Sequence, residues 1–134
     1  MITVIAGDHG LALSYPESPH ALRVIECPVE LQRQMGGNAM IGRELWYFLN
    51  DTGFSGGAVS PRQVYADSSR PEYIEGVRNI IIISMVKGVR DQALAADMID
   101  ADSWERGIRV LNLTTDGNGS FACTFFKATG VKSR

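Results

Sequence analysis

The chain has 134 residues, of which 45 % are apolar and 21 % are charged. This composition is typical of a globular protein and excludes collagen-like, coiled-coil and disordered chains. The length predicts a single domain over residues 1–134. The 13 basic and 15 acidic residues give a formal net charge of −2, which argues against a protein that binds nucleic acid through bulk positive charge.

The N-terminus lacks the basic segment and apolar run of a secretory signal, so we expect a cytoplasmic protein. The longest apolar run, around residues 80–83, is far shorter than the roughly 20 residues that a membrane span needs. Cys27 and Cys123 lie far apart and outside any metal-binding or redox motif. We therefore expect two buried free thiols in a reducing compartment, and no membrane association.

The first predicted element is a strand over residues 2–6 (ITVIA), in which only Thr3 is polar. An apolar run of this kind predicts a strand that is buried on both faces, as in the interior of a parallel sheet. Residues 7–10 (GDHG) are predicted to end the strand, which places Asp8 and His9 where α/β proteins bind ligands. The alternative is a polar turn with a hydrogen-bonded histidine. Because such a strand rarely begins a domain, we expect further protein upstream of it.

Two helices and a strand are predicted next. Apolar residues at helical spacing predict a helix over residues 22–35, kinked or split at Pro28. Asn38 is predicted to cap a second helix, which ends near Gly53. Residues 58–65 predict a strand at a sheet edge, because the nitrogen of Pro61 cannot donate a hydrogen bond to a neighbouring strand.

The second half of the chain predicts more helix and a last strand. Residues 71–85 predict a helix whose apolar face includes Ile81 and Met85, although the isoleucine run would also suit a strand. Asp102 and Glu105 resemble a capping box that begins a further helix. Residues 121–126 are apolar on both faces, which predicts a strand in the middle of a sheet.

The order of these elements resembles the C-terminal half of a class I S-adenosylmethionine-dependent methyltransferase, in particular the group that methylates small molecules. The stretches that carry the resemblance are residues 4–10 (VIAGDHG), 29–32 (VELQ), 36–43 (GGNAMIGR) and 124–130 (TFFKATG). The resemblance implies an α/β fold with a three-stranded mixed sheet, in which an antiparallel last strand lies between two parallel strands. Helices pack on this sheet, as in a Rossmann-like enzyme.

Methyltransferases of this family bind the cofactor at a glycine-rich turn and an acidic residue, both N-terminal to the part that this chain resembles. The clustered residues Gly53, Gly56 and Gly57 precede a strand and do not link a strand to a helix, so they do not form that turn. The resemblance thus names S-adenosylmethionine as the family's cofactor. It also implies that the isolated chain binds no cofactor and is not catalytic alone.

In such an enzyme, the end of the first strand and the helices after it form the acceptor side. The resemblance implies that Asp8 and His9 face a small-molecule acceptor, with His9 as a general base. The side chains implied to orient the acceptor are Tyr15, Gln32, Asn38 and Arg43. Each has a structural alternative: Tyr15 on a proline turn, Gln32 on a solvated helix face, Asn38 as a helix cap and Arg43 in a surface ion pair.

The sequence leaves two other functions open. The first strand is expected to have an unpaired side, so the chain could be a homodimeric binding module or could pair with a partner chain there. A hydrolase that combines His9 with an acid, or with Cys27, is the other alternative. The sequence has no GxSxG motif to support it, and an unusually reactive Cys27 would favour it.

Overall fold

The computed structural model describes residues 1–132 and divides into two compact units. The first unit consists of Met1–Ala12, Asn38–Val64 and the described residues from Cys123 onward. The second unit consists of Leu13–Gly37 and Tyr65–Ala122. Each of the three strands within residues 1–132 has residues in both units, and each unit has its own apolar core.

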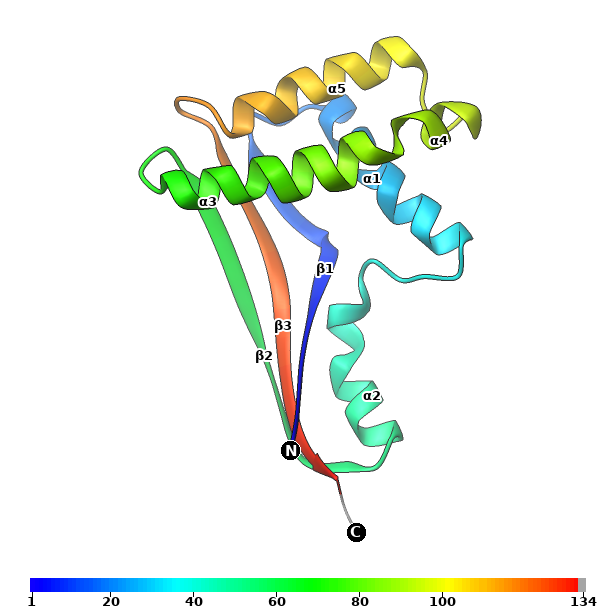
Figure 1. The fold of residues 1–134 in the computed structure, drawn as a ribbon, viewed down its shortest axis with the longest axis vertical. Coiled ribbons are helices and arrows are strands. Elements are labelled where there is room, and N and C mark those ends of the chain that lie inside the picture. The colour runs from blue at the N-terminus through cyan, green and yellow to red at the C-terminus, as the bar shows by residue number, and fades with distance from the viewer. Residues whose placement is uncertain (133–134) are drawn as a thin grey trace. The chain divides into compact units, whose positions relative to one another are not determined.

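The three strands β1 (Ile2–Tyr15), β2 (Phe54–Asp67) and β3 (Ser120–Lys132) form one sheet in the order β1-β3-β2 (Figure 1). Hydrogen-bonded neighbours run antiparallel throughout. The prediction of an α/β protein is confirmed, but the prediction of a mixed sheet is wrong, because the sheet is antiparallel. The last strand, β3, lies between β1 and β2 and runs opposite to both, so no two parallel strands are paired and no crossover helix between paired strands is needed.

The strands extend far beyond the predicted boundaries, to 14, 14 and 13 residues. Residues 7–10 do not end β1, which continues to Tyr15. Burial on both faces of β1 was also a wrong prediction, since Ile5 is 65 % exposed. A strand at the sheet edge with cover on one face leaves alternate side chains in solvent. The predictions that β2, with Pro61, is an edge strand and that β3 is central are confirmed.

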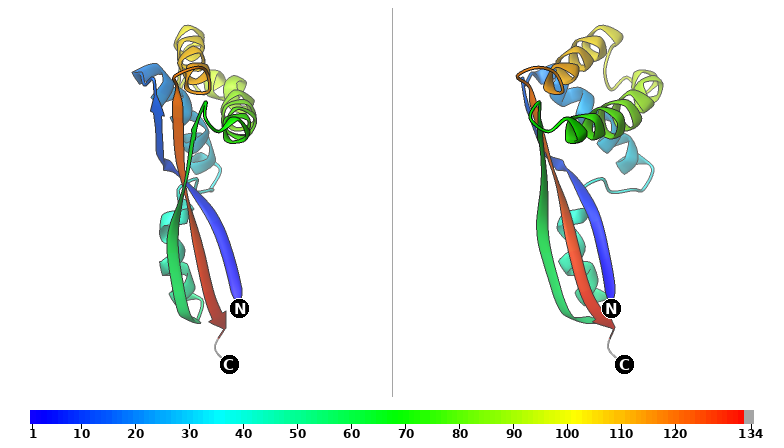
Figure 2. Two further views of the ribbon diagram at one scale, coloured as in Figure 1. Left: turned by 90° about the vertical axis from the view of Figure 1, so that its left-hand side faces the viewer. Right: turned by 60° about the vertical axis from the view of Figure 1, so that its left-hand side comes forward.

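The first unit places one short helix against its sheet. A 3₁₀ turn, η1 (Ile41–Glu44), leads into α2 (Leu45–Asp51), which lies along one face of the strands (Figure 2). Leu45 and Leu49 point from α2 onto Ala128 of β3, and these three buried residues form the centre of the core. The partly buried side chains around them are Ile2, Val4, Ala6, Phe54, Val59 and Phe126.

The second unit is mainly helical. It contains α1 (Pro19–Gln34), α3 (Pro71–Gly76), η2 (Val77–Val86), η3 (Lys87–Val89), α4 (Arg90–Ala95) and α5 (Ala101–Thr114). Helices α1 and α5 approach closely at Gly107, where a Cβ would lie 2.3 Å from Cγ2 of Val24. Trp104 and Leu111 of α5 are buried in this core. Within residues 1–132, no helix has both the length and the apolar character that would let it cross a membrane.

Several local predictions need correction. Pro28 lies inside α1 without splitting it into two helices. Helix α5 is capped by Asp100, whose carboxylate accepts from the amide of Ser103, and not by Asp102. The predicted helix over residues 71–85 is present, but η2 has π-helical hydrogen bonds. These wider turns bury Ile82 and Val86, each one position beyond the residues that α-helical spacing predicts.

Candidate functional site

The site is built where residues 38–44 lie across β1. The amide of His9 donates to the carbonyl of Ala39 at 3.0 Å. A Cβ on Gly42 would lie only 2.7 Å from the carbonyl oxygen of Ala6, so the two backbones approach more closely than any side chain would allow. The chain thus folds residues 38–44 directly onto the stretch of β1 that contains Ala6, Gly7 and His9.

An ion pair between a buried carboxylate and a half-exposed guanidinium joins these two segments. Nε of Arg43 donates to Oδ2 of Asp8 at 2.6 Å, and Nη2 donates to Oδ1 at 2.9 Å. The amide of Gly10 also donates to Oδ1, at 3.0 Å. The side chain of Asp8 is 0 % exposed, whereas that of Arg43 is 48 % exposed. Both carboxylate oxygens are therefore occupied, in the bidentate geometry that suits a guanidinium.

Each member of the pair stabilises the charged form of the other. The hydrogen bonds from Arg43 hold the pKa of Asp8 below its usual value, against the opposing effect of burial. The same hydrogen bonds raise the pKa of Arg43. Asp8 is thus an ionised carboxylate at neutral pH, and both of its oxygens already accept hydrogen bonds. It can hold Arg43 in place, but it is poorly suited to take a proton from a ligand.

Asn38 closes the same segment and does not cap a helix. Its Oδ1 accepts from the amide of Met40 at 2.9 Å, and its Nδ2 donates to the carboxylate of Glu44. Neither η1 nor α2 begins with a side-chain cap. The side chain of Asn38 therefore fixes the turn that brings Arg43 over β1.

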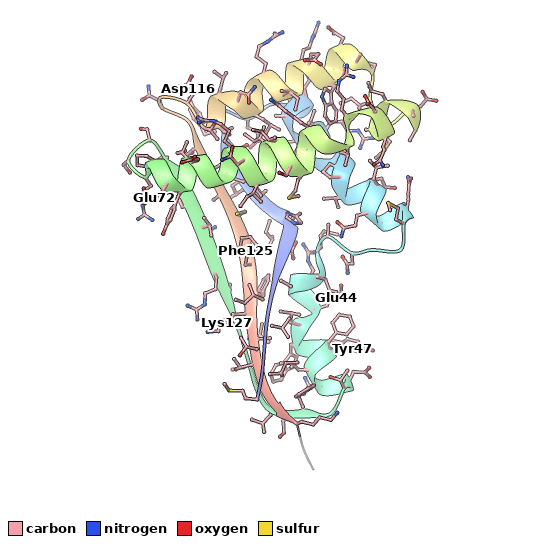
Figure 3. All side chains as sticks on the ribbon, viewed as in Figure 1. Glu44, Tyr47, Glu72, Asp116, Phe125 and Lys127 are labelled. Atoms are coloured by element: carbon pink, nitrogen blue, oxygen red, sulfur yellow. The ribbon has the colours of Figure 1, made fainter. Side chains whose placement is uncertain are left out.

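His9 lies on the opposite face of β1 from Asp8, because successive side chains of a strand alternate. A Cβ on Gly7 would lie 3.6 Å from Nε2 of His9 and 3.4 Å from the ring of Phe125, which projects from β3 (Figure 3). Burial lowers the pKa of His9 more than the nearby charge of Asp8 raises it. The imidazole is therefore neutral at pH 7 and able to accept a proton.

Comparison of the sequence with models of known protein families gives no match, and comparison with curated proteins gives none either.

The structure brings together four of the six predicted site residues in the first unit. Arg43 bonds Asp8, Asn38 bonds Met40 and Glu44 in the same segment as Arg43, and His9 lies on the other face of β1. The remaining two belong to the second unit. Tyr15 is exposed at the end of β1, and Gln32 is exposed near the end of α1.

Sequence reasoning missed the glycines that make the site. A Cβ on Gly10 would lie 2.7 Å from Sδ of Met40 and 2.8 Å from Nη2 of Arg43, so only glycine leaves room for the ion pair as it stands. The signal was present in the sequence: Gly10 follows the acidic residue of the pair by two positions, and Gly42 directly precedes its arginine. Glycine permits a close approach of the backbone, and that is its role at both positions.

Both cysteines are free and buried, as the sequence predicted. Burial raises the pKa of each thiol, and Sγ of Cys27 donates to the carbonyl of Arg23 at 3.2 Å. A nucleophilic cysteine needs the opposite, a lowered pKa and access to solvent. The environment of Cys27 thus counts against the hydrolase alternative that would use it.

Proposed function

We propose that this chain is the acceptor-side part of an S-adenosylmethionine-dependent methyltransferase that acts on a small molecule, and that it is not catalytic alone. The observation that supports the proposal is the ion pair between Asp8 and Arg43. It joins two separate stretches of the resemblance, residues 4–10 and 36–43, into one site. Two stretches that are similar to a family by chance need not lie together in the fold, whereas two stretches that form one binding site must be neighbours.

The residues have distinct roles in this proposal. Asp8 is a positioning residue, because both of its oxygens are occupied by Arg43 and Gly10. Arg43 orients the acceptor through the part of its guanidinium that faces solvent. His9, whose pKa is lowered by burial, is the general base that accepts the proton released when the acceptor is methylated. Because His9 lies on the face of β1 opposite to Asp8, this role requires an acceptor that extends from one face of β1 to the other.

The cofactor does not fit the residues that the structure describes. Within residues 1–132, β1 and β2 lead into helices through the sequences PES and SSR, neither of which contains glycine. Gly53 and Gly56 both have positive φ, but Gly53 lies at the turn from α2 into β2 and Gly56 lies within β2. We therefore assign no residue of this chain to the cofactor, and the proposal requires that another segment or chain binds it.

The free edge of β1 is the place where such a partner would join. Among residues 1–132, β1 pairs with one strand, β3, and residues 38–44 cover part of β1, where the amide of His9 donates to Ala39. The exposed side chains of β1 include Ile5 and Leu11, which are unusual on an edge strand without a second partner strand. A partner strand that paired there would cover these residues and extend the sheet.

Calorimetric titration with S-adenosylhomocysteine tests the proposal, first on the chain alone and then on the chain isolated together with whatever copurifies with it. We expect binding by the complex and none by the chain alone. In the complex, His9→Gln should abolish transfer of a labelled methyl group while leaving S-adenosylhomocysteine binding intact. The proposal is wrong if neither preparation binds S-adenosylhomocysteine, or if His9→Gln retains full transfer.

A second candidate function is a homodimeric binding module in which two copies pair through β1. The same free edge and the exposed Ile5 favour it. Light scattering should then report a dimer that Ile5→Lys dissociates. Ile80→Lys is the matched control, since Ile80 is 62 % exposed but lies on η2 in the second unit. A monomeric wild-type protein would rule out this candidate.

A further inference from the structure

One edge of the Arg43 guanidinium is unused by the protein. Nε and Nη2 are bonded to Asp8, whereas Nη1 has no hydrogen-bond partner within residues 1–132. The side chain is 48 % exposed. A guanidinium carries five N–H donors in one rigid plane, so the donors on Nη1 remain available to a ligand.

The surroundings of Arg43 present this edge in a fixed orientation. Two hydrogen bonds to a fully buried carboxylate define the plane of the guanidinium. Gly10 leaves room for the guanidinium to take this orientation, because a Cβ there would lie 2.8 Å from Nη2. A ligand that binds to Nη1 therefore meets a donor that has already lost its rotational freedom, which lowers the entropic cost of binding.

The local charge indicates what kind of ligand this donor suits. Asp8 cancels the positive charge of Arg43 through direct contact. The carboxylate of Glu44 lies near enough to raise the pKa of Arg43 and adds a further negative charge. The three groups together carry a net negative charge, which repels a carboxylate or phosphate but leaves hydrogen-bond donors for a neutral oxygen.

We propose that Arg43 binds a neutral carbonyl oxygen, of an amide or a ketone, through Nη1. The assignment of that carbonyl to a methyl acceptor rests on the proposed function, but the binding itself does not. It depends only on the fixed guanidinium and on the net charge of Arg43, Asp8 and Glu44.

Titration of the ¹⁵N-labelled protein with benzamide and with benzoate tests this proposal without any cofactor. These probes share size and shape but differ in charge. We expect benzamide to give saturable shifts of the Arg43 Nε and Gly10 amide resonances, with an affinity at least about tenfold higher than that of benzoate. Arg33 is the internal control, since its Nε and Nη2 are also bonded to one carboxylate, that of Glu30.

Arg43→Lys should abolish the benzamide shift at Gly10, because an ammonium cannot bond Asp8 and present a second, planar pair of donors. Arg33→Lys should leave it unchanged. The wild-type comparison of Arg43 with Arg33 stands even if Arg43→Lys does not fold. Equal or tighter benzoate binding, equal shifts at both arginines, or no saturable shift with benzamide would each overturn the proposal. Failure of methyl transfer alone would leave it standing.

Discussion

The protein contains two arginine–carboxylate pairs with the same fork geometry in opposite surroundings. Arg33 donates to Glu30 through Nε at 3.0 Å and through Nη2 at 2.6 Å. These side chains are 70 % and 36 % exposed and lie three residues apart on α1. Arg43 donates to Asp8 through the same two nitrogens, but Asp8 is fully buried and lies 35 residues away in the sequence.

The difference shows that the environment, more than the geometry, decides what an ion pair does. Water replaces the partner of an exposed charge at little cost, so the pair on α1 adds little to stability. Water does not reach Asp8 in the same way, so loss of Arg43 would leave an unpaired carboxylate in the interior. The pair that contains the buried Asp8 joins residues 38–44 to β1, whereas the exposed pair joins two residues of one helix, α1.

The largest effect is expected for Arg43→Ala. This change leaves the buried carboxylate of Asp8 without its charged partner. It should therefore lower the midpoint of urea-induced unfolding more than any of the substitutions below. Arg33→Ala is the matched control and should leave the midpoint almost unchanged. Equal effects of the two substitutions would show that burial does not distinguish the pairs.

Gly42→Ala should cost about 1–3 kcal/mol, because the new methyl group would overpack the contact with β1. The Cβ would lie 2.7 Å from the carbonyl oxygen of Ala6 and 2.9 Å from that of Gly7, both rigid backbone atoms. Gly88→Ala is the control, since nothing lies within 4 Å of that position. Urea denaturation measures both, and a neutral Gly42→Ala would contradict the close approach.

The two carboxylates should also differ in acid. The pKa of Asp8 is lower in the folded protein than in the unfolded chain, so its contribution to stability is present above about pH 3.9. That contribution is lost as the pH falls through the folded value, because the unfolded chain then binds the proton first. Asp8→Asn should flatten the pH dependence of the urea midpoint in this range. Glu30→Gln, at the exposed pair, should leave the slope almost intact.

The smallest effect concerns His9, on the other face of β1. Burial lowers its pKa, so its ring should titrate below about pH 6.5 when followed by NMR. The unfolded chain binds this proton more readily, so the contribution of His9 to stability declines as the pH falls below that value. Phe125→Ala should admit water and move the pKa back towards its ordinary value. Titration of His9 at or above about pH 6.5 would contradict the burial.

Predictions from the sequence were confirmed where they depend on the properties of a residue or of a short segment. Pro61 marks an edge strand because it lacks a donor, and this holds in any fold. The apolar run of residues 121–126 predicted a central strand, and β3 is central. Periodicity failed on η2, because side chains obey a 3.6-residue spacing only if the helix keeps α-helical bonds, and neighbouring segments decide that.

The candidate site shows the same division. The residues of the buried pair could be named from the sequence, since both lie in stretches that resemble a methyltransferase. Their pairing could not, because Asp8 and Arg43 are 35 positions apart and no periodicity connects a strand to a turn beyond the next helix. The sequence also did not predict that the side chains of Asp8 and His9 lie on opposite faces of β1, because residues 7–10 were interpreted as a turn. It follows only once β1 continues through them as a strand.

The sequence by itself determined the α/β fold class, the two free thiols and the presence of most of the helices and strands. These follow from composition and from the backbone preferences of single residues, which act over a few positions. Only the tertiary structure decided that the sheet is antiparallel, that Asp8 is buried and that Arg43 keeps one edge free. Each of these depends on contacts between distant segments, where solvent is excluded and charges must find partners.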